Sequence, residues 1–249
     1  MIKENITFTL ITIVDNKDVY NEFQRNLEMQ TNIKYELIPI MNLNNELDSP
    51  REAFNESGKN ARGKYIMFIH PDIRFLSRKA LHDIAEEMNK IDNVGVIGVA
   101  GAKPITKNKR IIISRIYQGL DKQRVGQWNN KDYEEVQTVD ECLFIIKKEY
   151  FIDHLFEIKP GWHLYAVEYC LNTILDGYKN FVVKADVWHL SPGNSLDPKY
   201  VMQLEELVKK YKKNFKQIST TVKAWPTTGV KPYIYRRYYY IKQKIKQII

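Results

Sequence analysis

The sequence places a histidine and an aspartate directly after a short apolar segment. Residues 64–69 are strongly apolar and predict a strand, which His70, Pro71 and Asp72 bring to an end. A carboxylate just beyond the carboxyl end of a buried strand points into the crevice where α/β sheets bind their ligands. A divalent cation such as Mg²⁺ or Mn²⁺ needs few protein oxygens there, because water and phosphate complete its coordination. Asp72 is therefore a candidate metal ligand, and the alternative is a turn residue that caps the following loop.

The segments around this motif alternate between strand and helix. Strands are expected at residues 6–14, 34–41, 64–69 and 94–100, with helices between them at 19–29, 50–61 and from 77 to about 91. This order predicts an α/β fold with a single open, mainly parallel sheet flanked by helices, of the Rossmann-like kind. The strand ends to watch for a ligand are then Asp15, Asn42 and the His70 to Asp72 turn.

The second half of the sequence is less regular. Residues 103–132 are polar and predict a long loop with short strands, and 136–147 predict one further strand. A helix is expected at 165–175, a strand at 178–187, and a final domain helix from Asp197, where apolar residues recur every three or four positions. Residues 151–156 stay unassigned.

Four motifs, in the right order, resemble those of family 2 glycosyltransferases. Residues 61–73 (ARGKYIMFIHPDI) are similar to the turn, apolar strand and Asp-x-Asp metal motif of that family, in which one bacterial subgroup has His in place of the first Asp. Residues 139–147 look like its acceptor-side strand. Residues 165–171, followed by Gly177 and Tyr178, resemble the helix with its acidic catalytic motif, and residues 188–193 resemble its late His segment. The resemblance covers roughly residues 6–195.

This resemblance implies a GT-A fold and a metal-dependent, inverting transfer from a nucleotide-diphosphate sugar, with a UDP-sugar favoured. The acceptor would be a saccharide or a lipid-linked or protein-linked molecule in surface-glycan synthesis. It implies Mn²⁺ or Mg²⁺ held by Asp72 together with His189, and a carboxylate base, for which Glu168 is the first choice and Asp140 the second. Ala166 stands where the family often has an acid, so a catalytically weakened homologue that binds a nucleotide sugar or glycan is the alternative.

Donor contacts are expected from residues at strand ends and on the following elements: Ile13, Asp15, Asn42, Asn55, Arg62, His70 and Asp72. For several of these, a turn, a helix surface or a loop is an equal interpretation. His70 is expected to support the loop rather than bind the cation, because a hard cation prefers oxygen. His163, next to Trp162, is a candidate for the acceptor side.

Positive charge is concentrated at the C-terminal end. The whole chain has a net charge of +8, but residues 199–249 hold 13 Lys and Arg against 2 acids, which leaves the remaining 198 residues at −3. Such asymmetry favours an anionic partner for the tail, and the alternative is a solvated helical face. A nucleic-acid-binding protein acting through this tail is a second class of function, but the near-neutral main body argues against nucleic acid as a partner.

The tail also has an apolar pattern. Ile234, Tyr238, Ile241, Ile245 and Ile248 recur at spacings of four and three, which predicts one apolar stripe on an amphipathic helix. Three interpretations are open: contact of residues 231–249 with a membrane surface, a coiled-coil seam in a homodimer, or packing back onto the domain. The sequence thus divides into a nucleotide-sugar-binding domain at 1–218 and a linker with this basic helix at 219–249.

Composition argues against a disordered chain, a membrane-spanning helix and a disulfide-linked framework. The chain has 249 residues, 44% of them hydrophobic, which fits a packed globule and not a disordered chain. Its apolar runs are far shorter than the roughly 20 residues that a membrane-spanning helix needs. Two cysteines make neither a disulfide framework nor a metal cluster. Since no signal peptide is recognisable, a cytoplasmic protein, peripheral on the inner membrane face through its tail, is expected.

Overall fold

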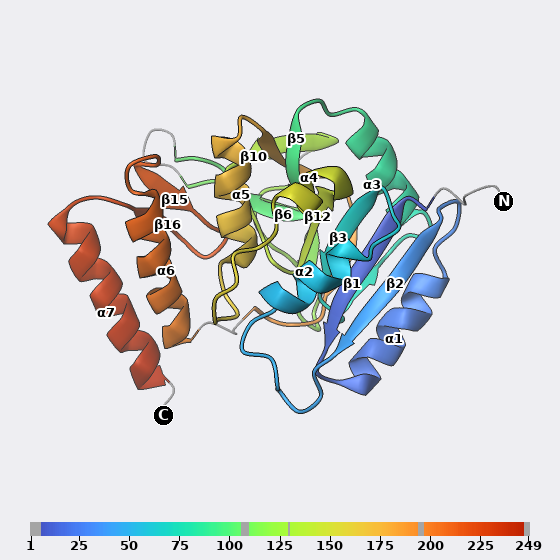
Figure 1. The fold of residues 1–249 in the computed structure, drawn as a ribbon, viewed down its shortest axis with the longest axis horizontal. Coiled ribbons are helices and arrows are strands. Elements are labelled where there is room, and N and C mark those ends of the chain that lie inside the picture. The colour runs from blue at the N-terminus through green and yellow to red at the C-terminus, as the bar shows by residue number, and fades with distance from the viewer. Residues whose placement is uncertain (1–5, 106–109, 129, 194–196, 247–249) are drawn as a thin grey trace.

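A seven-stranded mixed sheet forms the centre of the molecule (Figure 1). The structure is a computed structural model that describes residues 6–105, 110–128, 130–193 and 197–246. In spatial order the strands are β10 (Tyr133–Val136), β13 (Lys179–Val183), β5 (Val94–Gly98), β12 (Leu143–Lys147), β3 (Tyr65–Ile69), β1 (Phe8–Val14) and β2 (Tyr35–Met41). Strands β13, β5, β3, β1 and β2 run in one direction, and only β12 and β10 oppose their neighbours. The predicted α/β fold with a mainly parallel sheet is therefore confirmed.

The central strands are apolar along their whole length because helices cover both faces of the sheet. All five residues of β3 are buried, and in β1 the side chains of Phe8, Leu10 and Ile11 have no exposed surface. Such continuous apolar runs are typical of parallel strands with both faces covered. One core cluster packs the sheet against α1 (Lys17–Glu28) and α3 (Ala80–Asn89). The other packs it against α2 (Arg51–Lys59), α4 (Lys148–Asp153) and α5 (Tyr165–Leu175).

Local signals in the sequence fix several of these boundaries. Helix α1 begins after Asn16, whose side-chain oxygen accepts hydrogen bonds from the backbone N–H groups of Asp18 and Val19. The turn before β3 needs Gly63, because a Cβ there would come within 2.5 Å of the Thr9 backbone nitrogen. The predicted helix at 50–61 is shorter than expected, since α2 starts at Arg51, whose backbone N–H donates to the Ser49 hydroxyl at 3.3 Å.

Two predicted strands are each broken in the structure, and both breaks matter for the site. Residues 136–147 were expected to form one strand, but β11 (Thr138–Val139) and β12 are separated by a turn at 140–142. That turn is closed because the Asp140 carboxylate accepts the backbone N–H of Cys142 at 3.1 Å. Similarly, the expected strand at 178–187 is split into β13 and β14 (Val187–His189), which belong to different sheets.

Three small sheets complete the molecule. They are β11 with β6 (Ala100–Ala102) and β7 (Ile112–Ser114); β4 (Ile73–Phe75) with β14, β8 (Ile116–Gln118) and β9 (Gln123–Arg124); and β15 (Gln217–Ser219) with β16 (Ala224–Pro226). Their short strands carry the loops that border the carboxyl ends of the central strands.

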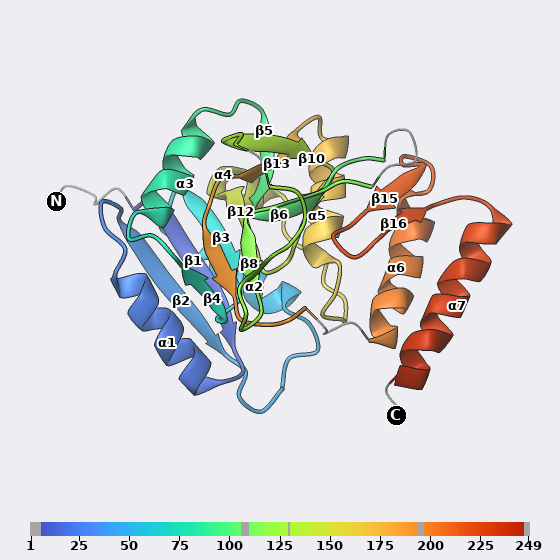
Figure 2. The ribbon, with the colours of Figure 1, turned by 180° about the vertical axis from the view of Figure 1, so that it is seen from behind.

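The C-terminal elements form a third layer at one end of the molecule. Helices α6 (Pro198–Tyr211) and α7 (Val230–Lys246) lie side by side there, at the opposite end from α1 (Figures 1 and 2). Their apolar cluster also contains Trp225, which is 1% exposed. Strand β15 spans residue 218, where the sequence suggested a domain boundary, so the hairpin joins the two predicted parts. Among the helices that the structure describes, none combines the length and apolar character needed to cross a membrane.

Candidate active site

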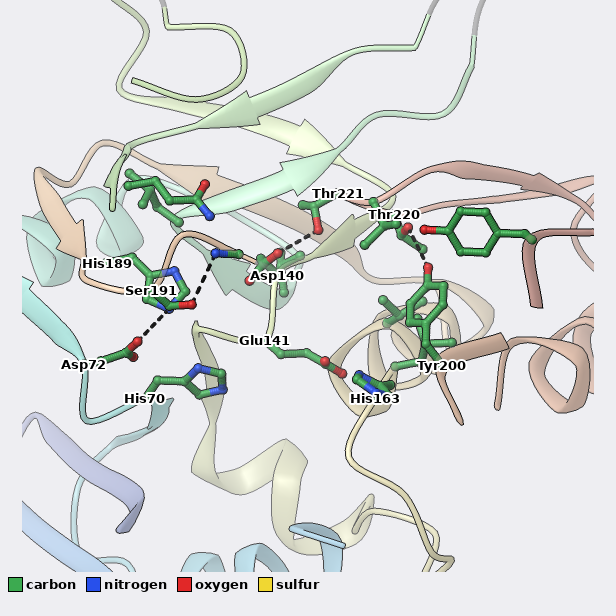
Figure 3. Close-up of a pocket in the computed structure, with 18 residues that line it drawn as sticks. His70, Asp72, Asp140, Glu141, His163, His189, Ser191, Tyr200, Thr220 and Thr221 are labelled. Carbon is green, nitrogen blue, oxygen red and sulfur yellow. Dashed lines mark hydrogen bonds and ion pairs between the residues drawn. The ribbon is translucent and has the colours of Figure 1, made fainter. Parts of the chain in front are cut away.

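A cavity of about 630 Å³ opens where β3, β14, the turn after β11, the start of α5 and the C-terminal layer meet (Figure 3). Its titratable lining residues are His70, Asp72, Asp140, Glu141, His163, His189, Tyr200 and Tyr239. The cavity therefore brings together residues from six separate parts of the chain, at the sheet edge where ligands of α/β folds bind.

His70, Asp72 and His189 form one wall of this cavity. Strand β14 pairs antiparallel with β4, which sets His189 opposite Ile73 and brings its Nε2 to 3.2 Å from the Asp72 carboxylate. One potential ligand atom from each of the three residues lies within 4.8 Å of the other two. The remaining Asp72 oxygen, Oδ1, is buried and has no hydrogen-bond partner. Two imidazoles and a carboxylate with one unsatisfied buried oxygen fit a divalent transition-metal ion such as Mn²⁺. His70, expected to contact the donor and to support the loop rather than bind the cation, also contributes a potential ligand atom to this group.

Burial and contact with one another shift the pKa values of Asp72, His189 and His70. Burial alone would raise the pKa of Asp72, but the hydrogen bond from His189 and the nearby imidazoles bring it below its usual value. For His189, burial works in the opposite direction, and the contact with Asp72 raises its pKa overall. Burial dominates at His70 and lowers its pKa. Asp72 is thus held ionised, and His70 is held neutral with a lone pair free to bind a metal.

Two adjacent carboxyl groups, Asp140 and Glu141, project from the turn between β11 and β12. The Asp140 carboxylate is fixed by the Thr221 hydroxyl, which donates to Oδ2 at 2.6 Å, and by the turn hydrogen bond described above. Glu141 reaches the amino end of α5, where Oε1 accepts the backbone N–H of Ala166 at 3.4 Å. This helix has no side-chain cap of its own, since Leu164 stands at its N-cap with a left-handed backbone, φ 62°. Glu141 therefore supplies the missing cap from a neighbouring loop.

Glu141 has the strongest pKa shift among the carboxyl groups. Burial, followed by the negative charge of Asp140, raises its pKa to about 8, although Arg51 and the α5 amides act against the shift. In Figure 3 this side chain lies between the group of His70 and Asp72 and the group of His163 and Tyr200. A carboxyl group with a pKa near neutrality that faces a cavity is suited to proton transfer.

The opposite wall comes from the loop before α5 and from the C-terminal layer. His163 Nε2 lies 3.0 Å from the Asp197 carboxylate, which also caps α6 by accepting the Tyr200 N–H. The Tyr200 hydroxyl is 3.3 Å from the Thr220 hydroxyl and accepts the Trp225 indole N–H at 3.1 Å. His163 therefore lines the cavity, and its assignment to the acceptor side stays a prediction.

Glu168, the first choice for the catalytic base, does not line the cavity. Its buried carboxylate accepts from Lys159 Nζ at 2.8 Å and from Lys210 Nζ at 3.0 Å, and lies 3.7 Å from an Arg51 nitrogen. Arg51 in turn donates to the Gly161 carbonyl at 2.8 Å. In this position Glu168 holds α2, α5, α6 and the loop before α5 together.

The predicted donor-side residues divide into two groups. Ile13 is the penultimate residue of β1, Asp15 is exposed just after it, and the Asn42 backbone N–H donates to the Val14 carbonyl at 2.8 Å. These three residues lie at the carboxyl ends of β1 and β2, on the same edge of the sheet as His70. Buried Asn42 also accepts the Leu47 N–H at 3.1 Å, which shapes the loop that follows β2.

Asn55 and Arg62, by contrast, are not among the residues that line the cavity. Both amide atoms of Asn55 bind the backbone of Phe156, at 2.8 and 2.9 Å. Arg62 precedes β3 at its amino end, with an exposed side chain 2.5 Å from the Glu36 carboxylate. The helical pattern around residue 55 and the turn at 61–63 gave no sign of which edge they would face.

Several residues of the site were missed from the sequence. The apolar pattern at 136–147 predicts Glu141 inside a strand, where alternate side chains would face the core, and gives no sign of the turn. Thr221 and Tyr239 come from residues 219–249, which the sequence separates from the nucleotide-sugar-binding domain. The adjacent acids at 140 and 141 in an otherwise apolar segment were the available signal, because two neighbouring carboxyl groups are costly inside a strand.

Comparisons with known proteins identify a family and solved structures of similar fold. The model of a family described as "Glycosyltransferase like family" matches residues 9–217. A crystal structure of S. aureus TarS 1-349 superposes with a TM-score of 0.55 at 13% identity, covering 82% of this chain and 65% of that one. The same protein in complex with UDP-GlcNAc gives a TM-score of 0.57 at 13% identity, covering 82% and 66%. This chain thus spans slightly less than two thirds of the TarS chains. No curated protein matches the sequence.

Proposed function

The chain belongs to the glycosyltransferase-like family, and we propose that it transfers a sugar from a nucleotide-diphosphate sugar, most simply a UDP-sugar, to an acceptor hydroxyl. The observation that carries this proposal is the cavity in which a potential metal site and a carboxyl group with a raised pKa face each other. Family membership supports the class of reaction, and these residues supply the groups that it needs.

On the donor side, the leaving diphosphate must be bound and its growing negative charge neutralised. Asp72, His189 and His70 would hold a divalent cation, with Mn²⁺ favoured over Mg²⁺ because two of the three ligands are imidazoles. When bound, such an ion supplies Lewis-acid stabilisation of the diphosphate. Asp15 and Asn42, at the neighbouring strand ends, would contact the nucleoside part of the donor.

On the acceptor side, we assign the general base to Glu141. The acceptor oxygen attacks the anomeric carbon, the bond from that carbon to the diphosphate oxygen breaks, and the hydroxyl proton passes to the Glu141 carboxylate. Asp140 raises the basicity of this group through its charge and is itself fixed by Thr221. A single displacement of this kind inverts the anomeric centre, as the family resemblance implies.

Ala166 need not weaken the enzyme under this assignment. Its side chain is fully buried in the core, and its backbone N–H contacts the Glu141 carboxyl group. The acid that the sequence motif lacks on α5 is thus replaced by one that reaches the same helix end from the β11–β12 turn. We propose further that the acceptor is a saccharide or a lipid-linked or protein-linked molecule in surface-glycan synthesis.

The reaction can be tested by comparing two isosteric variants. Glu141→Gln should retain donor binding but lower the transfer rate by about 100-fold or more, because proton transfer by a positioned base contributes on that order. Glu168→Gln, measured at a temperature where it is folded, should retain most of the rate. Donor binding is followed by thermal shift with UDP-sugars and Mn²⁺. If no nucleotide sugar shifts the melting temperature with or without metal, the proposed function is wrong.

A further inference from the structure

Helix α7 uses only one of its faces to pack against the rest of the molecule. On that face Arg236 is 4% exposed, and its guanidinium lies 2.7 Å from the Glu205 carboxylate and donates to the Pro226 carbonyl at 2.8 Å. Tyr239 packs edge-on against Trp225, with ring centroids 5.5 Å apart, and Gln243 is 6% exposed. Buried polar groups with partners and a buried indole fix the orientation of this helix on α6 and the β15–β16 hairpin.

The opposite face of α7 is apolar and open to solvent. Ile234, Tyr238, Ile241 and Ile245 follow one another at spacings of four, three and four, which places them on one side of the helix. Their exposed fractions are 61%, 61%, 55% and 51%. The helix therefore does pack back onto the domain, but through its other face and not through this stripe. Ile248, the last predicted member, lies outside the described residues.

Positive charge borders this stripe, and α7 has no acidic residue of its own. The side chains of Arg237, Lys242 and Lys244 are exposed on α7, next to the stripe in the helical projection. No Asp or Glu occurs after Glu206 in the sequence, so the helix has no carboxylate of its own to offset them. Exposed tyrosines at 233, 235 and 238 add amphipathic rings on and beside the stripe. An apolar stripe with basic flanks and tyrosines is complementary to an anionic lipid surface.

We propose that α7 is an interfacial helix that docks this protein on an anionic lipid surface. The four stripe residues would enter the boundary between head groups and acyl chains, while the three basic side chains bind the phosphates. A second copy of the chain is the weaker occupant, because paired helices would bring like charges together along the seam. Coiled-coil dimers instead set opposite charges across their seam.

This inference goes beyond the proposed function and does not depend on it. One consequence links the two: Tyr239, on the packing face of α7, also lines the cavity. The helix that docks is thus also part of the cavity wall, which would bring the acceptor side of the cavity close to the lipid surface.

The test is flotation of the full chain with two kinds of vesicle, phosphatidylcholine alone and an equal mixture with phosphatidylglycerol. We expect binding to the anionic vesicles only, and loss of that binding at high salt. A stripe variant (Ile234→Ser, Ile241→Ser, Ile245→Ser) should bind about 100-fold more weakly, since each half-exposed isoleucine contributes roughly fivefold. A charge variant (Arg237→Gln, Lys242→Gln, Lys244→Gln) should also lose about fivefold per residue.

A matched control removes three apolar side chains of similar exposure elsewhere: Met29→Ser, Ile152→Ser and Leu175→Ser, which are 49%, 44% and 48% exposed. It should float like the original protein. Equal flotation of the stripe variant and this control would overturn the proposal, as would a lack of binding to anionic vesicles. A dimer in solution that only the stripe variant disrupts would assign the face to a second copy instead. Thermal shift by a donor on the same variants tests the proposed function separately.

Discussion

As pH rises, the original protein should lose stability and gain activity, and Glu141→Gln should remove both effects. The pKa of Glu141 is about 8 in the folded protein, against 4.5 for an ordinary glutamate. Because its pKa is raised in the folded state, the Glu141 carboxyl group makes its full contribution to the free energy of unfolding below about pH 4.5. That contribution is lost as pH rises through about 8. The full shift corresponds to about 5 kcal/mol, and partial contact with solvent reduces the expected loss to about 2–4 kcal/mol.

Urea unfolding at pH 5, 7 and 9 measures this difference. The original protein should lose about 2–4 kcal/mol of unfolding free energy relative to Glu141→Gln between pH 5 and pH 9, because the glutamine stays neutral. Glu149→Gln, at an exposed glutamate on α4, is the matched control and should follow the original protein. If the unfolding free energies of the original protein and Glu141→Gln change in the same way with pH, the Glu141 carboxyl group is not buried and neutral in the folded protein.

The same group predicts the pH dependence of the reaction. A base must be ionised, so kcat/KM should rise with pH, reach half its maximum near pH 8, the pKa of Glu141, and level off about one pH unit above that. Glu141→Gln should lose this rise together with most of the rate. A rise that persists unchanged in the variant would assign the base to another residue.

Three further substitutions test other parts of the structure. Glu168→Gln leaves Arg51, Lys159 and Lys210 without their shared anion and should cost about 2–3 kcal/mol, measured by urea unfolding; no change would mean that the cluster does not support the fold. Trp225→Ala should cost about 3–5 kcal/mol and make α7 sensitive to limited proteolysis, because this side chain is 1% exposed. His189→Gln should weaken Mn²⁺ binding by about 100-fold or more, measured by calorimetry with the metal alone. If the variant binds Mn²⁺ as tightly as the original protein, His189 is not a metal ligand.

The first hundred residues could be predicted well because local signals and burial agree there. Continuous apolar strands such as β3 alternate with capped helices, and that pattern has one simple solution, a mostly parallel sheet. The end of β3 at His70 and Asp72 then follows from where the apolar run stops.

The rest of the site depends on contacts between distant segments. The split of β13 from β14 places His189 beside Asp72, and the turn at 140–142 places Glu141 at the start of α5. Each depends on a partner far away in sequence, which periodicity does not reveal. The position of Glu168 in a helix could be predicted, but its ion pairs could not, because their partners lie on other elements.

A crystal structure of the chain with UDP and Mn²⁺ tests the proposed site most directly. We expect the metal to be bound by Asp72 and His189, with the diphosphate on the metal and the nucleoside along the ends of β1 and β2. A nucleotide bound elsewhere, with the Asp72 and His189 pair intact and free of metal, would contradict it.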